Sequence, residues 1–107
     1  MSKDLYIFGN GDMAELVNYY FEDHSDYKIK AFVVDDEYFK EKSFCKKEII
    51  KKSDFLKIDK NNIFIFVALG YRNLNKVREE KYLFFKKEGY KFASYISKNA
   101  TILNNYN

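Results

Sequence analysis

Two glycines near the N-terminus are spaced as in a nucleotide-binding turn. Gly9, Gly11 and Ala14 form a Gly-x-Gly-x-x-Ala pattern that follows the apolar residues 5–8. In such a turn the first glycine permits a sharp reversal, the second lets a ligand approach the backbone, and the small third residue lets a helix pack close to the strand. The pattern predicts that Gly9, Asn10 and Gly11 contact a ligand, although the same residues would also suit a tight turn that binds nothing.

Two adjacent carboxylates follow the next apolar segment. Residues 27–34 alternate at first and then become continuously apolar, as in a strand that is buried on both faces. Asp35 and Asp36 come directly after it, where nucleotide-binding α/β folds place the acid that accepts hydrogen bonds from a ribose or a base. Adjacent acids at a strand end can also simply begin a turn. Because the Gly-x-Gly turn precedes them, we favour the ligand-binding interpretation.

A third polar segment, residues 70–78, contains both arginines of the chain. It follows the strongest apolar run of the sequence, at 63–69. Arginine offers a planar fork of donors that suits phosphate or carboxylate. We therefore take Arg72 and Arg78 as candidate ligand-binding residues, with an ion pair on the helix surface as the alternative for Arg78. The other candidates in this segment are Gly70, Tyr71 and Asn75.

The elements that must position these residues follow from the hydrophobic pattern. We expect strands at about 4–8, 27–34, 62–69 and 90–96, and helices at about 12–23 and 74–88. Lys81 interrupts the apolar stripe of the second helix and would have to extend its ammonium group towards solvent. Residues 37–61 are harder to assign. A short edge strand is expected near 43–45, and approximate helical spacing runs from 46 to 56.

Strands that alternate with helices predict an α/β fold, because parallel strands need crossover connections. With right-handed crossovers, the strands form a Rossmann-like open parallel sheet of about five strands in the order 3-2-1-4-5, flanked by helices. The three polar segments then meet above the carboxyl ends of the strands, which is where such sheets bind ligands.

The composition limits the class of protein. The 107 residues suffice for one domain, which we place at residues 1–96, and no apolar run is long enough to span a membrane. Since a secretory signal pattern is also lacking, we expect a cytoplasmic protein. The net charge of +3 comes from lysines interleaved with acids, so we expect no nucleic-acid partner. His24 and Cys45 lack neighbours that would activate them, so we expect no catalytic or metal-binding residue in this chain.

The motifs, taken in order, resemble a known family. Its pattern is a strand with a Gly-rich turn, a strand ending in paired Asp, a strand ending in Ala-x-Gly with Asn-x-x-Arg opening the next helix, a Gly-aromatic pair, and a Ser/Pro-x-Ala-x-Ile segment. These motifs occur here at 7–11, 32–36, 68–70, 75–78, 89–90 and 97–102. The chain is therefore similar to the N-terminal domain of bacterial sugar O- and N-acyltransferases, which include sialic-acid O-acetyltransferases and nucleotide-amino-sugar N-acetyltransferases of the left-handed β-helix type.

The resemblance implies a domain that holds the nucleotide part of a UDP- or dTDP-linked sugar, of the kind used in polysaccharide biosynthesis. Asp35 and Asp36 would face the base or ribose, and the Gly-rich turn would lie near the phosphates. It also implies that acetyl transfer occurs in a β-helix of hexapeptide repeats that binds acetyl-CoA and assembles a trimer. Residues 97–107 would be either a polar tail or the start of that β-helix. The chain by itself would then need no cofactor.

The chain departs from the family pattern at the start of the first helix. Asp12 and Met13 replace a Gly-His pair that is common in the family. A carboxylate at position 12 would repel a phosphate at the helix N-terminus, and we expect Asp12 to act as the helix N-cap instead. The phosphate is then expected to contact Arg72 or backbone amides.

Two alternatives to the nucleotide-sugar hypothesis remain open. The first is a redox-sensing module that binds NAD through Gly9, Gly11 and Asp35 or Asp36, although the chain lacks a full second mononucleotide-binding half. The second is a protein-interaction domain whose cleft has lost its ligand.

Overall fold

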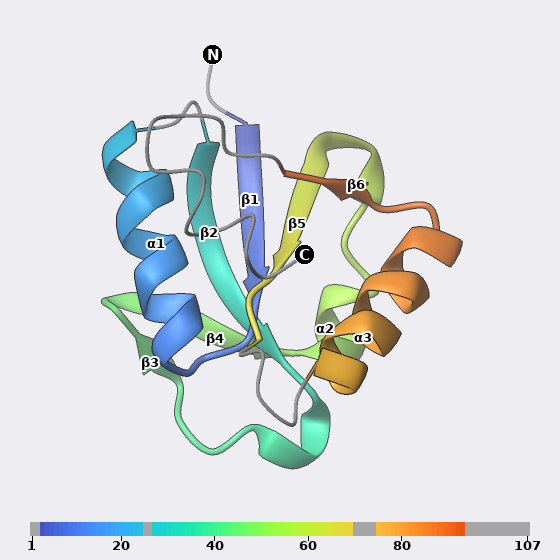
Figure 1. Ribbon diagram of the computed structural model, residues 1–107, viewed down its shortest axis with the longest axis horizontal. Helices are drawn as coiled ribbons and strands as arrows, with labels where there is room; N and C mark the ends of the chain where they lie inside the picture. Colours follow the sequence, from blue (N-terminus) through green and yellow to red (C-terminus); the bar gives the residue numbers. More distant parts are fainter. Residues whose placement is uncertain (1–2, 25–26, 70–74, 94–107) are drawn as a thin grey trace.

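The computed structural model describes residues 3–24, 27–69 and 75–93, which form a six-stranded sheet with helices packed against it (Figure 1). The strands are β1 (Lys3–Phe8), β2 (Tyr27–Val34), β3 (Ser43–Phe44), β4 (Lys47–Lys51), β5 (Ile63–Val67) and β6 (Lys91–Phe92). The α-helices are α1 (Asp12–His24), α2 (Lys52–Phe55) and α3 (Asn75–Lys87), and two short 3-10 helices are η1 (Asp36–Tyr38) and η2 (Lys60–Asn62).

The sheet has the strand order β3-β4-β2-β1-β5-β6 and is mostly parallel. Strand β1 lies at its centre, with β2 on one side and β5 on the other, both parallel to it. Strands β4 and β6 extend the sheet in parallel, whereas β3 pairs with β4 in the antiparallel direction. The ends of β1, β2 and β5 therefore lie next to one another at one edge of the sheet.

The α/β class is confirmed, but the expected sheet of five strands in the order 3-2-1-4-5 is wrong in its strand count and in its outer part. The stretch 46–56, expected to be helical, instead contains β4 and only one helical turn, α2. Strand β4 reads Lys-Glu-Ile-Ile-Lys, in which the adjacent Ile49 and Ile50 point to opposite faces. Two adjacent isoleucines fit both the period of a strand and that of a helix, so the hydrophobic pattern alone could not distinguish the two.

Each face of the sheet carries its own apolar cluster. Because successive side chains of a strand point to opposite faces, β1 contributes Leu5 and Ile7 to one cluster and Phe8 to the other. The first cluster packs against Val17 and Phe21 of α1, and the second contains buried residues of α2 and α3. Figure 1 shows the same division, with α1 on one side of the strands and α2 and α3 on the other. In the described part of the chain, no helix has the length and apolar character needed to cross a membrane.

The hairpin between β3 and β4 contains a strained turn. Cys45 and Lys46 both have positive φ angles, of 52° and 65°. A two-residue turn with both residues in this region is of the type that strongly favours Asn-Gly, because a side chain at positive φ crowds the backbone. Burial, and next the carboxylate of Glu15, raise the pKa of the Cys45 thiol, so the thiol stays protonated and unreactive at neutral pH.

Replacing Lys46 with glycine should relieve this strain. We expect Lys46→Gly to raise the free energy of unfolding by about 1 kcal/mol, because the left-handed conformation costs a non-glycine residue about that much. Urea denaturation monitored by circular dichroism measures the change. Lys42→Gly is the matched control, since Lys42 is also exposed but is not among the residues with positive φ. That control should lower stability by up to about 1 kcal/mol, and equal effects of the two variants would contradict the strain argument.

Candidate functional site

The carboxyl ends of β1, β2 and β5 bring two of the three polar segments together. The backbone N–H of Gly9, directly after β1, donates to the carbonyl of Val33 in β2 at 2.8 Å. The N–H of Ala68, directly after β5, donates to the carbonyl of Phe8 at 2.9 Å. The turn at Gly9 and the acids at the end of β2 therefore share the lower edge of the sheet in Figure 1. The candidates Gly70, Tyr71 and Arg72 lie outside the described residues, as does the side chain of Asn75 at the start of α3.

The first glycine of the turn is required by packing. Gly9 is buried and has a φ of +122°, and a Cβ atom added to it would lie 2.7 Å from the carbonyl oxygen of Ala68. Gly9 therefore lets β1 leave the sheet in close contact with the end of β5. This requirement holds whether or not a ligand binds.

The second glycine faces open space. A Cβ atom added to Gly11 would meet nothing within 4 Å, and Asn10 beside it is exposed. The carbonyl of Gly11 accepts a hydrogen bond from the N–H of Glu15 at 3.0 Å, so Gly11 occupies the N-cap position of α1. The expectation that Asp12 is the N-cap is therefore wrong. Asp12 is the first helical residue, and Asp12 and Glu15 place two carboxylates in the first turn.

Asp35 is held by two lysines from different helices. The ammonium group of Lys81 in α3 lies 2.9 Å from Oδ1 and 2.7 Å from Oδ2 of Asp35. The ammonium group of Lys52 in α2 lies 3.6 Å from Oδ1. The side chains of Asp35 and Lys81 are only 18% and 19% exposed, so this ion pair is shielded more than a surface pair is. From its place in the apolar stripe of α3, Lys81 was expected to extend its ammonium group towards solvent. It instead pairs with Asp35.

Aromatic rings of the core support both lysines. The Lys81 ammonium lies 5.4 Å from the ring centre of Phe8, the residue before Gly9. The Lys52 ammonium lies 4.8 Å from the ring centre of Phe84 in α3. Because the face of an aromatic ring attracts a cation, these contacts fix the positions of the two charges beside the Gly-rich turn.

Asp36 has a different environment from Asp35. It is exposed, and its Oδ1 accepts a hydrogen bond from the backbone N–H of Ser53 at 3.1 Å. This hydrogen bond lowers the pKa of the Asp36 carboxyl, so the group is ionised at neutral pH. The Ser53 side chain also forms a hydrogen bond with the Asp36 carboxyl, which remains exposed to solvent and therefore accessible to a ligand.

Arg78 lies near the start of α3. Its side chain is half-buried, and its Nε atom is buried without a hydrogen-bond partner. No ion pair of Arg78 is found within the described ranges. The alternative role of Arg78 in a salt bridge on the helix surface therefore receives no support from this part of the chain.

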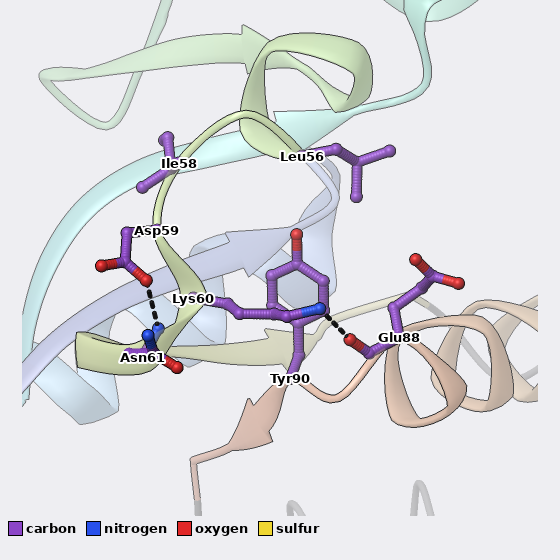
Figure 2. A pocket seen from close by; sticks show the side chains of 7 residues that line it. All are labelled: Leu56, Ile58, Asp59, Lys60, Asn61, Glu88 and Tyr90. Atoms are coloured by element: carbon purple, nitrogen blue, oxygen red, sulfur yellow. Dashed lines mark hydrogen bonds between the residues drawn. The ribbon is translucent and has the colours of Figure 1, made fainter.

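A pocket of about 270 Å³ lies elsewhere, towards the amino ends of β5 and β6. Figure 2 shows Lys60 of η2 lying across the ring of Tyr90, with its ammonium group bonded to the carbonyl of Glu88 at the end of α3. The N–H of Asn61 donates to Asp59 at 3.0 Å. These polar groups satisfy one another and cap the C-terminal end of α3, where a cation is stabilising. None of the residues predicted to bind a ligand lines this pocket.

Sequence reasoning missed three residues at the carboxyl edge. Lys52 and Ser53 fall in the segment that was hardest to assign, and nothing distinguishes Lys52 from the other lysines around it. Lys81 did carry a signal, because a lysine inside an apolar stripe needs either solvent or a counter-ion. A search for an unpaired acid at the end of a neighbouring strand could have identified Asp35 as that counter-ion.

Together these features define an open α/β domain with a mostly parallel sheet, whose polar side chains gather at the carboxyl ends of its central strands. Residues 4–83 match the family model of the PglD N-terminal domain. The chain therefore belongs to this family, the N-terminal domain of PglD-type sugar acetyltransferases, which confirms the resemblance found in the sequence motifs. Searches of curated proteins and of solved structures gave no match.

The two glycines of the turn should respond differently to alanine. Gly9→Ala should lower the free energy of unfolding by more than about 2 kcal/mol, since it adds both positive-φ strain and a contact with a backbone carbonyl. Gly11→Ala should cost less than about 1 kcal/mol, because its Cβ meets open space and only the N-cap preference is lost. Urea denaturation of both variants checks this difference, and similar losses would refute the assigned packing role of Gly9.

Asp35 should contribute to stability through its two lysines. We expect Asp35→Asn to lower the free energy of unfolding by about 1–3 kcal/mol, because it leaves two partly buried ammonium groups without their carboxylate. Asp54→Asn is the control, since Asp54 and Lys57 form an exposed pair at 3.8 Å that should contribute less than about 1 kcal/mol. If thermal and urea unfolding show the same small change for both variants, Asp35 has no such structural role.

Proposed function

We propose that this domain binds the nucleotide part of a nucleotide-activated sugar at the carboxyl edge of its sheet. The observation that carries the proposal is that an open backbone turn at Gly11 and the exposed, ionised carboxylate of Asp36 follow neighbouring strands at the same edge of the sheet. Membership of the PglD N-terminal domain family supports it, because that domain is part of a sugar acetyltransferase. Ligands of open α/β sheets bind at this edge, beside the central strands.

The two acids have different roles in this proposal. Asp36 accepts hydrogen bonds from the ribose or the base, because its carboxylate is exposed and ionised. Asp35 is already neutralised by Lys81 and acts as a positioning residue. It holds α3, and with it Arg78, next to the end of β2. The base that Asp36 contacts in this proposal is the uracil of a UDP-linked sugar or the thymine of a dTDP-linked sugar.

The phosphates lie near Asn10 and Gly11, where no side chain blocks the backbone. They contact the exposed backbone of the turn before α1 and not the N–H groups within its first turn, because the carboxylates of Asp12 and Glu15 there repel an anion. Arg72, Arg78 and the segment from Gly70 to Asn75 are the proposed partners on the other side of the phosphates. Arginine suits this role because its fork of donors matches a phosphate.

Acetyl transfer is assigned to another part of the enzyme. None of the residues at the carboxyl edge described above is a histidine or a cysteine, the groups best suited to accept a proton from an attacking amine or hydroxyl near neutral pH. We propose that acetyl-CoA binds, and that a trimer forms, through a β-helix domain following this one. The role of the present domain is to present the sugar by holding its nucleotide.

Binding of nucleotide sugars tests this function. We expect saturable heat on titration with UDP- or dTDP-linked sugars in isothermal calorimetry, and a loss of affinity of about tenfold or more in Asp36→Asn, because a charge-assisted hydrogen bond is weakened. Asp54→Asn is the control, because its exposed carboxylate pairs with Lys57 and is not assigned to the ligand. Absence of binding at millimolar ligand would refute the proposal. Binding of NADH without any response to nucleotide sugars would instead support the dinucleotide alternative.

A further inference from the structure

The two lysines that contact Asp35 do so unequally. Lys81 contacts both oxygens of Asp35 at hydrogen-bond distance, whereas Lys52 lies 3.6 Å from one oxygen and makes only an ion pair. Hydrogen bonds from Ser53 have the larger effect in lowering the pKa of the Asp36 carboxyl, and Lys52 lies near enough to that carboxyl to help lower it. Of the two ammonium groups at Asp35, that of Lys52 is therefore the one without a carboxylate oxygen at hydrogen-bond distance among the described residues.

The side chain of Lys52 is fixed by its contacts, but its ammonium group keeps donors that a ligand could use. Its side chain is 29% exposed, and its ammonium group lies over the ring of Phe84. A lysine ammonium has three donors, and no hydrogen bond from that of Lys52 is found in the part of the chain that the structure describes. A fixed cation with available donors is a suitable partner for an anionic oxygen, because little side-chain entropy remains to be lost on binding.

Other cations near this edge are less available. The ammonium group of Lys81 is committed to Asp35, and the Nε atom of Arg78 is buried. Lys51 lies over the ring of Phe39, but its side chain is exposed and no ion pair holds it among the described residues, so it is less fixed than Lys52. On the opposite side of the turn, the first turn of α1 carries acidic residues, so an anion is repelled from it. The electrostatics of the edge therefore favour an anion on the side of α2 and α3.

We propose that Lys52 contacts a phosphate group of the bound nucleotide and supplies the positive charge that the N-terminus of α1 does not. This inference rests on the proposed function, since it names a further ligand contact at the same edge. Asp35 then acts as a shared counter-ion that keeps both lysines in place, and the phosphate gives Lys52 an anionic oxygen at hydrogen-bond distance.

The test compares ligands with and without phosphate. Wild type, Lys52→Gln and the control Lys57→Gln are titrated with UDP and with uridine, and in parallel with dTDP and thymidine. Lys57 is 79% exposed and pairs only with Asp54 among the described residues, which makes it a matched surface lysine. Lys52→Gln should weaken the binding of UDP or dTDP by about tenfold or more, which corresponds to one charge-assisted hydrogen bond. Nucleoside binding and the behaviour of Lys57→Gln should match wild type.

Two further variants separate a phosphate contact from a structural role. Lys52→Arg should retain the affinity for UDP, and Lys52→Met, which keeps the contact with Phe84, replaces the glutamine variant if that variant unfolds. The affinity of Lys52→Gln and Lys52→Met for UDP or dTDP should also depend less on salt concentration than that of wild type, because these variants lack a charge interaction that salt screens. Thermal unfolding confirms that each variant is folded.

The outcomes distinguish this inference from the function on which it rests. Wild type that binds none of the four compounds or their sugar conjugates overturns the proposed function and the role of Lys52 together. Wild type that binds UDP or dTDP while Lys52→Gln binds them equally well overturns the role of Lys52 alone. An equal loss for nucleotide and nucleoside also overturns it, because Lys52 would then act only by positioning Asp35.

Discussion

The ion pair between Asp35 and Lys81 determines how the carboxyl edge of the sheet is built. It joins the end of β2 to the middle of α3, and the Lys81 ammonium lies beside the ring of Phe8 at the end of β1. Helix α3 has few buried side chains, and Phe85 is its one fully buried large residue within the described chain. A lysine in the stripe of such a helix would oppose docking on the sheet unless a carboxylate met it. The pair therefore gives α3 a defined position where its apolar contacts alone are few.

This constraint also explains why two adjacent and identical residues differ in their surroundings. Asp35 continues from a buried strand and turns its carboxylate towards the cations of α2 and α3, whereas Asp36 begins η1 and is exposed. The direction of each side chain depends on the backbone at the end of β2 and on helices that follow much later in the chain. A sequence pattern identifies the pair as candidates but contains no information on which of the two is paired internally. Only the placement of Lys52 and Lys81 decides it.

The sequence predicted the parts of the fold that carry long, uniform patterns. The apolar runs of β2 and β5, the stripe of α1 and the Gly-rich turn each have one favoured interpretation, and their elements were located correctly. Strand β4 was missed because its five residues contain two apolar side chains between charged ones, and the strained turn at Cys45 and Lys46 carries none of the usual turn residues. The ion-pair partners were missed because they lie far apart in sequence: Asp35 and Lys81 are separated by 46 positions. Gly70, Tyr71 and Arg72 lie outside the described residues, so their assignment stays a prediction.

The two ends of the sheet differ in how their polar groups are satisfied, and this difference argues for where a ligand binds. At the amino end, Lys60 covers the ring of Tyr90 and caps α3, so the cation at the pocket there already has a partner within the chain. At the carboxyl end, Lys52 has no hydrogen-bond acceptor in the described structure, the carboxylate of Asp36 is exposed, and a Cβ atom added to Gly11 would meet open space. A folded chain tends to pair its own polar groups, since each unpaired group costs free energy when it is shielded from water. Asp36 and Lys52 both contact solvent, so the fold does not require partners for them, and under the proposed function they are the charges beside the open turn that a nucleotide, with its donors and anionic oxygens, would contact.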